Sequence, residues 1–372
     1  MIRLKELGYV LFAVSFRICS LFPRKKNRFF LVATHDSSGE GNIGIMARRI
    51  KRVKPDSDLC FYTRKDSIRH PIRFFAVLPY QLATASYVLL DNEFLPMAYL
   101  SFGKDVKVVQ LWHGTGTIKK FGQDANTGRL YELERRCNRN LTDLIVSSEY
   151  FADIYQSAFH VPRETIRVLG LPRTDLFWNE AACEKRKQRF YQKFPDLKGK
   201  ELILYAPTFR DDQLENQGMS FDYERVSSSL GKDQILLLRF HPFVAKAWKE
   251  KGLTLPDNIL DVSGYEGIST LLLVADRLIT DYSSVVFEYC LLKRPMIFYA
   301  YDLEHFSEQG RSFYEDYESF VPGPVVKKLE DLLEELKNPG KTSSYEGFID
   351  QCYQYLDGKS GERVLRLLFS EE

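Results

Sequence analysis

Two histidines stand where strands of a parallel sheet are expected to end. His113 follows an apolar run that ends at Leu111 and opens the turn His113-Gly114-Thr115-Gly116, and His241 follows the run from Ile235 to Phe240. An imidazole titrates near neutrality and can accept a proton from a hydroxyl. His113 is therefore the candidate general base, and His241 is a candidate cation or hydrogen-bond donor at a leaving phosphate. A buried structural histidine is the alternative at both positions.

The glycine-rich turn after Leu111 supplies further candidates. Its glycines would let the backbone turn tightly and approach a ligand closely. Lys119 and Lys120 follow as cations. The molecule whose hydroxyl His113 would deprotonate is called the acceptor. We expect it to contact six residues of the first half of the chain, namely Trp112, Gly114, Thr115, Lys119, Arg173 and Asp175. For the segment Gly170 to Asp175, a purely structural role in closing the domain is the alternative.

A phosphate site is expected after two strands of the second half. Thr208 and Arg210 follow the strand Leu202 to Ala206, and a guanidinium binds phosphate oxygens in a bidentate manner. The alternative for Arg210 is an ion pair with its neighbours Asp211 or Asp212 on the same loop.

The second part of this site is the strand-to-helix junction at residues 277–288. Unsatisfied N–H groups at a helix N-terminus bind anions, so Ser283 and Ser284 suit a pyrophosphate. Asp281 and Glu288 complete the set of residues predicted to bind the phosphate-bearing substrate, called the donor. Glu288 is suited to a ribose. Ordinary helix capping by Asp281 or Ser283 is the alternative, and capping is compatible with anion binding.

The remaining polar motifs restrict the chemistry. The loop from Asp36 to Asn42 is polar and glycine-rich, which suits an acceptor or a phosphate but is weak on its own. No GxxxxGK[ST] motif is present, which disfavours a P-loop ATPase, and no acidic pair has the spacing of a dedicated metal site. We therefore expect no required cofactor and no protein-bound metal, with magnesium admissible only as a counter-ion of the substrate.

The elements that must position these residues alternate between strands and helices. Such alternation predicts parallel sheets covered by helices on both faces. The expected fold is α/β and GT-B-like, with two Rossmann-like doubly wound domains facing a cleft. The predicted strands are 29–34, 59–63, 87–91, 106–112, 144–147, 165–170, 202–206, 235–240, 259–262, 277–280 and 296–299.

The expected domain organisation follows from this pattern. We expect a helix with a basic flank at 1–27, an acceptor domain at 28–178 and a connection at 179–200. A donor domain at 201–340 and C-terminal helices at 341–372, which could pack back on the first domain, complete the chain.

The N-terminal segment is amphipathic. Six apolar residues recur at spacings of three and four and share one helical face: Leu4, Leu7, Leu11, Val14, Ile18 and Leu21. The apolar stretch from Leu7 to Phe22 contains Arg17 and is shorter than the roughly 20 residues that span a bilayer. We expect the helix to lie on an anionic membrane surface at its cytoplasmic face. Packing on the protein body, or a signal peptide, are the alternatives.

Charge and cysteine content narrow the classes further. The net charge is +2, and residues 1–30 hold seven Lys or Arg against Glu6 alone, so the remaining chain is slightly acidic. This distribution does not favour a nucleic-acid-binding protein. The six cysteines are scattered without a CxxC pair, which favours reduced thiols in the cytoplasm.

These motifs together resemble the CDP-glycerol glycerophosphotransferase family of teichoic acid synthesis. The resemblance rests on residues 111–115, 170–175, 206–210, 239–242 and 280–284, and continues through Arg294 to Tyr299 and Pro322 to Pro324, covering about residues 28–330. The family's two functional histidines match His113 and His241, and its phosphate contacts match Thr208, Arg210, Ser283 and Ser284. Gly116 and Glu288 depart from the proline and aspartate that members often carry.

The resemblance implies a peripheral membrane enzyme that transfers glycerol phosphate from CDP-glycerol to a polyprenyl-diphosphate-linked saccharide and releases CMP. The length resembles that of the short, priming members. A polymerising or ribitol-transferring enzyme, a sugar-nucleotide glycosyltransferase or epimerase, and a non-catalytic binding protein are the alternatives. The oligomeric state is left open.

Overall fold

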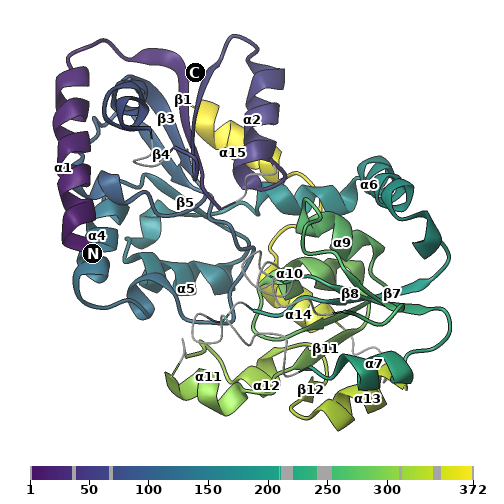
Figure 1. Cartoon of the computed structure of the whole chain (residues 1–372). Helices are drawn as coiled ribbons and strands as arrows, with labels where there is room; N and C mark the ends of the chain where they lie inside the picture. Colours follow the sequence, from purple (N-terminus) through teal and green to yellow (C-terminus); the bar gives the residue numbers. More distant parts are fainter. Residues whose placement is uncertain are drawn as a thin grey trace. The chain divides into compact units, whose positions relative to one another are not determined.

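The computed structural model describes residues 2–35, 39–66, 70–208, 210, 221–240, 254–309, 312–337 and 345–370. The chain divides into two units, each built on a parallel six-stranded sheet (Figure 1). Unit 1 contains Met1–Gly116, Lys120–Trp178 and Gln351–Glu372, and unit 2 contains Thr117–Lys119 and Asn179–Asp350. The predicted α/β class with two doubly wound sheets is confirmed.

The sheet of unit 1 has the order β2-β1-β3-β4-β5-β6. Its strands are β1 (Lys25–Ala33), β2 (Asp58–Thr63), β3 (Ala85–Leu90), β4 (Lys107–Gln110), β5 (Asp143–Val146) and β6 (Ile166–Val168). The central strands are buried along nearly their whole length, because helices cover both faces of a parallel sheet.

The helices of unit 1 connect these strands and cover the sheet. The α-helices are α1 (Ile2–Cys19), α2 (Asn42–Val53), α3 (Leu78–Ala83), α4 (Gly128–Asn138), α5 (Glu149–Phe159) and α15 (Ser360–Phe369). A π-helical turn, η1 (Arg73–Val77), runs into α3, and the 3-10 turns are η2 (Leu95–Tyr99), η3 (Gly122–Asp124), η4 (Arg163–Thr165) and η5 (Pro172–Trp178).

The sheet of unit 2 has the order β12-β11-β10-β7-β8-β9. Its strands are β7 (Glu201–Tyr205), β8 (Gln234–Leu238), β9 (Ile259–Asp261), β10 (Arg277–Thr280), β11 (Met296–Tyr299) and β12 (Val325–Val326). All eleven predicted strands are present, and β12 is an additional strand that was not predicted. A two-residue strand is too short to produce a periodic signal.

The helices of unit 2 begin with the connection predicted at 179–200. They are α6 (Glu180–Lys193), α7 (Tyr223–Ser229), α9 (Ile268–Val274), α10 (Val285–Tyr289), α11 (Leu303–Gln309), α12 (Tyr317–Phe320), α13 (Leu329–Lys337) and α14 (Glu346–Cys352), with 3-10 turns η6 (Pro195–Leu197) and η8 (Cys290–Leu292).

The C-terminal helix α15 packs beside α2 in unit 1, although more than 300 residues separate them in the chain (Figure 1). Val364 and Leu368 enter the core of unit 1 with Ile43, Met46 and Ile50 of α2. The last segment of the chain thereby completes the first sheet's cover, because its apolar face needs a partner surface.

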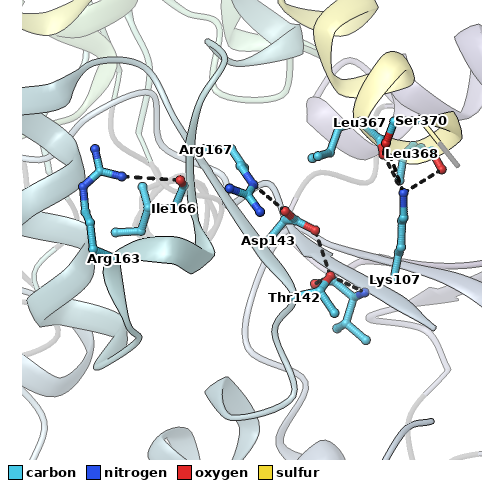
Figure 2. Close-up of polar contacts among 10 residues, drawn as sticks. Lys107, Thr142, Asp143, Arg163, Ile166, Arg167, Leu367, Leu368 and Ser370 are labelled. Carbon is cyan, nitrogen blue, oxygen red and sulfur yellow. Dashed lines mark hydrogen bonds and ion pairs between the residues drawn. The ribbon is translucent and has the colours of Figure 1, made fainter. Parts of the chain in front are cut away.

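Both ends of α15 are held by charged side chains of unit 1. At its N-terminus, the Asp175 carboxylate accepts hydrogen bonds from the backbone N–H groups of Ser360 and Gly361, at 2.8 and 2.9 Å. At its C-terminus, Lys107 Nζ donates to the carbonyls of Leu367 and Leu368, as Figure 2 shows. An acid at the start and a base at the end of a helix satisfy its free backbone groups and oppose its dipole.

Asp175 was predicted to contact the acceptor, and the structure gives it a different task. It is buried, its two oxygens are bonded to α15, and it pairs with Arg49 at 2.8 Å. A carboxylate committed in this way is not available to a ligand, so we remove Asp175 from the acceptor residues.

Replacing Asp175 with alanine is expected to destabilise unit 1 by about 2 kcal/mol, because a helix cap and a bonded carboxylate are lost together. Hydrogen exchange of peptides from α15 and α2 would report the loss as faster exchange. Asp175→Asn, which keeps one acceptor oxygen, should show a smaller increase. Unchanged exchange of α15 in the alanine variant would contradict the assigned role.

A second group of polar residues joins the strands β4, β5 and β6 of the same sheet. Arg167 of β6 donates to Asp143 of β5 at 2.8 Å, and Asp143 also accepts from the Thr142 hydroxyl at 2.9 Å (Figure 2). Thr142 in turn accepts from the backbone N–H of Val108 at 3.0 Å. These contacts fix the register of β4, β5 and β6 at the ends opposite to the candidate site.

Helix α1 has two apolar faces. Phe12 and Phe16 are buried, with Phe12 packed against Phe74 and Phe94 and Phe16 against Phe102. The face predicted from the spacing of apolar residues points away from the protein: Leu7, Leu11, Val14, Ile18 and Leu21 are 58, 50, 48, 60 and 86% exposed. The predicted packing alternative is therefore realised by the other face of the same helix.

No helix in the described part of the chain combines the length and the apolar character needed to cross a membrane.

Candidate functional site

The order of the strands places a topological switch point in each sheet. In unit 1 the chain proceeds from β1 to β2 on one side and then to β3 on the other. In unit 2 it proceeds from β7 to β8 on one side and to β10 on the other. Ligands of open α/β sheets bind beyond the carboxyl ends of the strands at such points. The residues that follow β1, β3, β7 and β10 are therefore the first candidates for ligand contacts.

An aspartate bridges the switch point of unit 1. Asp91, directly after β3, is buried and accepts hydrogen bonds from the backbone N–H of Thr34 at 2.9 Å and of His35 at 3.0 Å. The Thr34 hydroxyl donates to the same carboxylate at 3.2 Å. The end of β1 is thereby fixed to the end of β3.

An aspartate bridges the switch point of unit 2 in the same way. Asp281, directly after β10, is 1% exposed and accepts from the backbone N–H of Thr208, which follows β7, at 2.7 Å. In both units a threonine after the first strand is held by an aspartate from the strand across the switch point. The two halves are therefore alike at the switch points of their sheets.

The backbone of Trp112, the residue before His113, has an unusual conformation. Trp112 has φ = 53°, in the left-handed region that bulky residues rarely adopt. Its N–H donates to Gln110 Oε1 at 2.9 Å, and its carbonyl accepts from Asn42 Nδ2 at 3.0 Å. These bonds hold the unusual conformation. The sharp turn predicted here is made by Trp112 rather than by Gly114 or Gly116, neither of which has a positive φ.

Two aromatic rings lie next to the ring of His113. The His35 ring stacks on it with centroids 3.8 Å apart and planes at 7°, and the Trp112 ring lies 4.3 Å away at 31°. His113 Nδ1 is 3.0 Å from the carbonyl of Asp91. Since a carbonyl only accepts, Nδ1 carries the proton and Nε2 has the lone pair.

The surroundings of His113 keep it neutral. Burial lowers the pKa of His113 well below 6.5, the neighbouring His35 lowers it further, and the hydrogen bond to Asp91 opposes the shift. The charges of Arg173 and Arg64 also lower it. A neutral imidazole with a free Nε2 is the form that a general base requires.

The other predicted acceptor residues of unit 1 have mixed roles. Arg173 Nη1 donates to the carbonyl of His113 at 2.6 Å, so Arg173 lies beside the candidate base. The carbonyl of Gly114 accepts from Tyr155, and that of Thr115 accepts from Ser147. Thr115 is 1% exposed. We therefore assign Gly114 and Thr115 to the support of the turn.

Lys119 belongs to unit 2 rather than to the predicted acceptor domain. Residue Lys119 forms an antiparallel bridge with Phe313, and its ammonium lies 5.8 Å from the centre of the Phe306 ring. The backbone N–H of Tyr314 donates to Ile118 at 3.2 Å. The segment that follows the His113 turn is thus paired with unit 2.

Arg210 is not placed as a phosphate ligand. Its guanidinium is 3% exposed, pairs with Asp281 at 2.9 Å and binds both oxygens of Asp302. Its Nη1 donates to the carbonyl of Thr208 at 2.9 Å. Burial alone would lower the pKa of Arg210, but Asp281 and Asp302 raise it above its usual range. With its donors used in these contacts, Arg210 joins Thr208, Asp281 and Asp302.

The same contacts revise Asp281, which was predicted as a donor-site residue. Its carboxylate holds Thr208 and Arg210, and Tyr282 donates to Asp302 at 2.9 Å in the same cluster. Two carboxylates surround one guanidinium here, so the cluster carries a net negative charge and would repel a phosphate.

Three predicted donor residues remain as candidates. Ser283 and Ser284 are partly exposed just before α10, and Glu288 on α10 is buried. Helix α10 has only five residues, so its dipole is small and the serine hydroxyls must make most of any contact. Thr208 is nearly buried. His241, Asp211 and Asp212 lie outside the described residues.

Sequence reasoning missed His35 and Asp91. Both had a usable signal: His35 follows one predicted strand and Asp91 is the last residue of another, at the edge where ligands of parallel sheets bind. Glu93, close after β3, was not singled out either, and no contact that the structure describes places it beside His113. Burial and the neighbouring Glu134 raise the pKa of Glu93 to about 8. Glu134 itself accepts from Asn126 at 2.8 Å.

Among the described residues, no group of three or more His, Cys, Asp or Glu side chains has the arrangement of a metal site. All six cysteines are free thiols.

Known proteins resemble this chain over most of its length. It is 33% identical to the teichoic acid poly(ribitol-phosphate) polymerase of Bacillus spizizenii, over 99% of this chain and 60% of that protein. It is 36% identical to the ribitol-phosphate polymerase TarL of Staphylococcus aureus, over 78% of this chain and 53% of that one. The chain thus spans little more than half the length of these two relatives.

A shorter relative and the solved structures agree. The teichoic acid ribitol-phosphate primase of Bacillus spizizenii is 36% identical, over 78% of this chain and 76% of that protein. The wall teichoic acid polymerase TagF has been solved in a form that superposes with a TM-score of 0.80 at 25% identity, covering 96% of this chain and 93% of that one. A UDP-N-acetylglucosamine 2-epimerase from Listeria monocytogenes shares the fold alone, with a TM-score of 0.56 at 13% identity.

The family described as CDP-Glycerol:Poly(glycerophosphate) glycerophosphotransferase matches residues 14–370. Taken with the shared GT-B-like fold, this match shows that the chain belongs to the CDP-glycerol:poly(glycerophosphate) glycerophosphotransferase family.

Proposed function

We propose that this protein transfers an alditol phosphate, with glycerol phosphate as the first candidate, from a CDP-alditol to a hydroxyl of a membrane-linked acceptor in teichoic acid synthesis. The observation that carries the proposal is the His113 site: an imidazole whose pKa is lowered by burial, next to the rings of His35 and Trp112, with Nδ1 bonded to the Asp91 carbonyl so that Nε2 carries the lone pair. Family membership supplies the donor class.

In the proposed reaction, His113 Nε2 takes the proton of the acceptor hydroxyl. The acceptor oxygen forms a new bond to the phosphorus that carries the glycerol. The bond between that phosphorus and the bridging oxygen breaks, and CMP leaves with the electron pair. Such transfers depend mainly on positioning and charge neutralisation. Thr208, Ser283, Ser284 and His241 are the proposed groups for the donor phosphates.

Two observations support CDP-glycerol as donor, and one supports CDP-ribitol. The family description names CDP-glycerol, and a TagF variant has been solved after a soak with CDPG. The relatives that are 33 to 36% identical include ribitol-phosphate polymerases and a ribitol-phosphate primase. Ribitol phosphate transfer is therefore the second candidate function. The expectation of a priming enzyme rested on chain length and gains no further support. Polymerases and primases have similar percentages of identity to this chain.

The test is CMP release from CDP-glycerol and CDP-ribitol by the full chain, with a lipid-linked disaccharide and with the same acceptor carrying one glycerol phosphate. Product masses would distinguish one added unit from a ladder. A preference for CDP-ribitol would select the second candidate. No CMP release with any pair would refute the transferase proposal, and turnover of a sugar nucleotide would support a glycosyltransferase or epimerase instead.

We propose further that the protein works at the cytoplasmic face of the membrane, held there by α1. The exposed face of the helix presents Leu7, Leu11, Val14 and Ile18, and apolar exposure continues at Ile72 of the neighbouring segment, which is 80% exposed. Basic residues flank this strip at both ends: Lys5, Arg17, Arg24, Lys25 and Lys26. An apolar face bordered by cations binds anionic lipid surfaces.

Replacing Leu11 with glutamate is expected to weaken binding to vesicles of anionic phosphatidylglycerol at least about tenfold, because a charge replaces buried apolar area in the lipid. Co-sedimentation with vesicles measures the effect. Gln188→Glu adds the same charge to exposed helix α6 and should leave binding as it is. Equal binding of the Leu11 variant and the unmodified protein would refute the membrane role of this face.

A further inference from the structure

The backbone of the His113 turn is held on one side by side chains from other elements of unit 1. Asn42 Nδ2, at the start of α2, donates to the carbonyl of Trp112 at 3.0 Å. Arg173 Nη1, on η5, donates to the carbonyl of His113 at 2.6 Å. The next two carbonyls accept from a hydroxyl of α5 and from one just after β5. The carbonyl side of the turn is therefore occupied by hydrogen-bond donors of the protein.

The opposite side of the turn presents backbone N–H groups. Every peptide bond within the described residues is trans, and the N–H of a trans peptide points away from the carbonyl of the same peptide. The peptide that contains the Trp112 carbonyl also contains the N–H of His113, and the following peptide contains the N–H of Gly114. These two N–H groups consequently point away from Asn42 and Arg173.

Neither of these N–H groups has a hydrogen-bond partner among the residues that the structure describes. The N–H of Trp112, in contrast, donates to Gln110 Oε1 at 2.9 Å. Gly114 is buried, and an unpaired buried N–H costs free energy, so nearly all such groups in folded proteins have an acceptor. Two adjacent donors without a protein acceptor, at and directly after the candidate base, indicate a contact with a ligand.

We propose that the N–H groups of His113 and Gly114 bind a non-bridging oxygen of the phosphoryl group that is transferred, and stabilise its charge in the transition state. This inference rests on the proposed function and adds a catalytic group to it. Successive backbone N–H groups that point to one side form an anion-binding concavity. Because the side chains on the carbonyl side fix these donors in advance, no reorganisation is needed as charge develops.

The chemistry of the proposed transfer requires such donors next to the base. The acceptor hydroxyl must lie within hydrogen-bond reach of His113 Nε2, and the phosphorus that it attacks is one forming bond further on. The charge in such transfers is carried by the non-bridging oxygens of this phosphorus. Gly114 has no side chain, so a phosphate oxygen can approach its backbone closely. The two N–H groups keep their protons, and the bonds made and broken are those of the proposed function.

The test replaces one backbone amide by an ester. Gly114→glycolic acid, introduced by nonsense suppression, exchanges the N–H for an oxygen and keeps the length of the chain. It also weakens the carbonyl of His113, which accepts from an arginine. The matched control is Gly264→glycolic acid, at an exposed glycine whose preceding carbonyl likewise accepts from an arginine. Single-turnover kinetics give kcat for CMP release, and calorimetry gives the Kd of CDP-glycerol.

We expect Gly114→glycolic acid to lower kcat about a hundredfold, the usual effect of removing one donor from such a site. The Kd of CDP-glycerol should change less than twofold, because the contact forms in the transition state. Gly264→glycolic acid should match the unmodified protein. In the unmodified protein labelled with 15N-glycine, inorganic phosphate should shift the Gly114 amide proton downfield in a saturable way, and this signal is identified by its absence from the ester variant.

Three results would overturn the inference. One is a kcat of Gly114→glycolic acid within threefold of the unmodified value. Another is an equal loss in both ester variants, which would assign the effect to the weakened carbonyl. The third is a change confined to the Kd of CDP-glycerol. If the unmodified protein released no CMP, the proposed function would fail, and the phosphate titration would then decide the anion site: a saturable shift of the Gly114 amide would support it, and an unchanged signal would refute it.

Discussion

Replacing His113 with glutamine is expected to reduce kcat for CMP release by about a thousandfold, the usual contribution of a positioned general base. Glutamine can still donate to the Asp91 carbonyl and contact His35 and Trp112, but it has no basic nitrogen to take the acceptor's proton. The Kd of CDP-glycerol should stay the same, because the proposed donor contacts lie in unit 2. Single-turnover kinetics and calorimetry measure the two quantities separately.

The pH dependence provides an independent measurement on the same residue. Because burial and the neighbouring His35 lower the pKa of His113 well below 6.5, the neutral, active form persists to a lower pH than for a free histidine. The acid limb of kcat/KM should therefore fall below pH 6.5. His160→Asn, at the exposed left-handed end of α5, is the matched control and should keep full activity.

Two outcomes would contradict the base assignment. If His113→Gln lost CDP-glycerol binding while remaining folded, His113 would belong to the donor site. If its kcat fell less than tenfold, another group would have to accept the proton.

Replacing Arg210 with methionine is expected to destabilise unit 2 by about 3–5 kcal/mol, the usual effect of removing one partner from a buried ion pair. Asp281 and Asp302 would remain buried without a counter-charge. The aromatic rings around the guanidinium, Tyr301 at 4.9 Å and Tyr282 at 5.5 Å, would lose a cation as well. Hydrogen exchange of peptides from β7 and β10 would detect the local opening.

The double variant Arg210→Met with Asp302→Asn is the informative control. It removes one of the two unpaired charges, so exchange in β7 and β10 should be slower than in Arg210→Met alone. A phosphate-binding role for Arg210 predicts a different result. In that case Arg210→Met would exchange like the unmodified protein and would lose affinity for CDP-glycerol.

The amino-acid sequence alone was sufficient for the strands, the fold class and the place of the candidate base. Runs such as Leu202 to Ala206 are apolar over a short length and end at polar residues, which is a local pattern. The ends of parallel strands lie at one edge of the sheet, so the importance of His113 followed from its position after β4. Trp112, in contrast, gave no sign of its left-handed backbone, because the bonds from Gln110 and Asn42 that hold it are tertiary.

Only the tertiary structure decided which charges and rings are partners. The sequence placed Asp211 and Asp212 beside Arg210, yet the guanidinium binds Asp281 and Asp302, which follow β10 and β11. It binds them because β10 lies next to β7 in the sheet although about 70 residues separate them. The stacking of His35 on His113 and the capping of α15 by Asp175 arise in the same way. Strand order is set by how the whole chain buries its apolar surface, and no local pattern of residues contains that information.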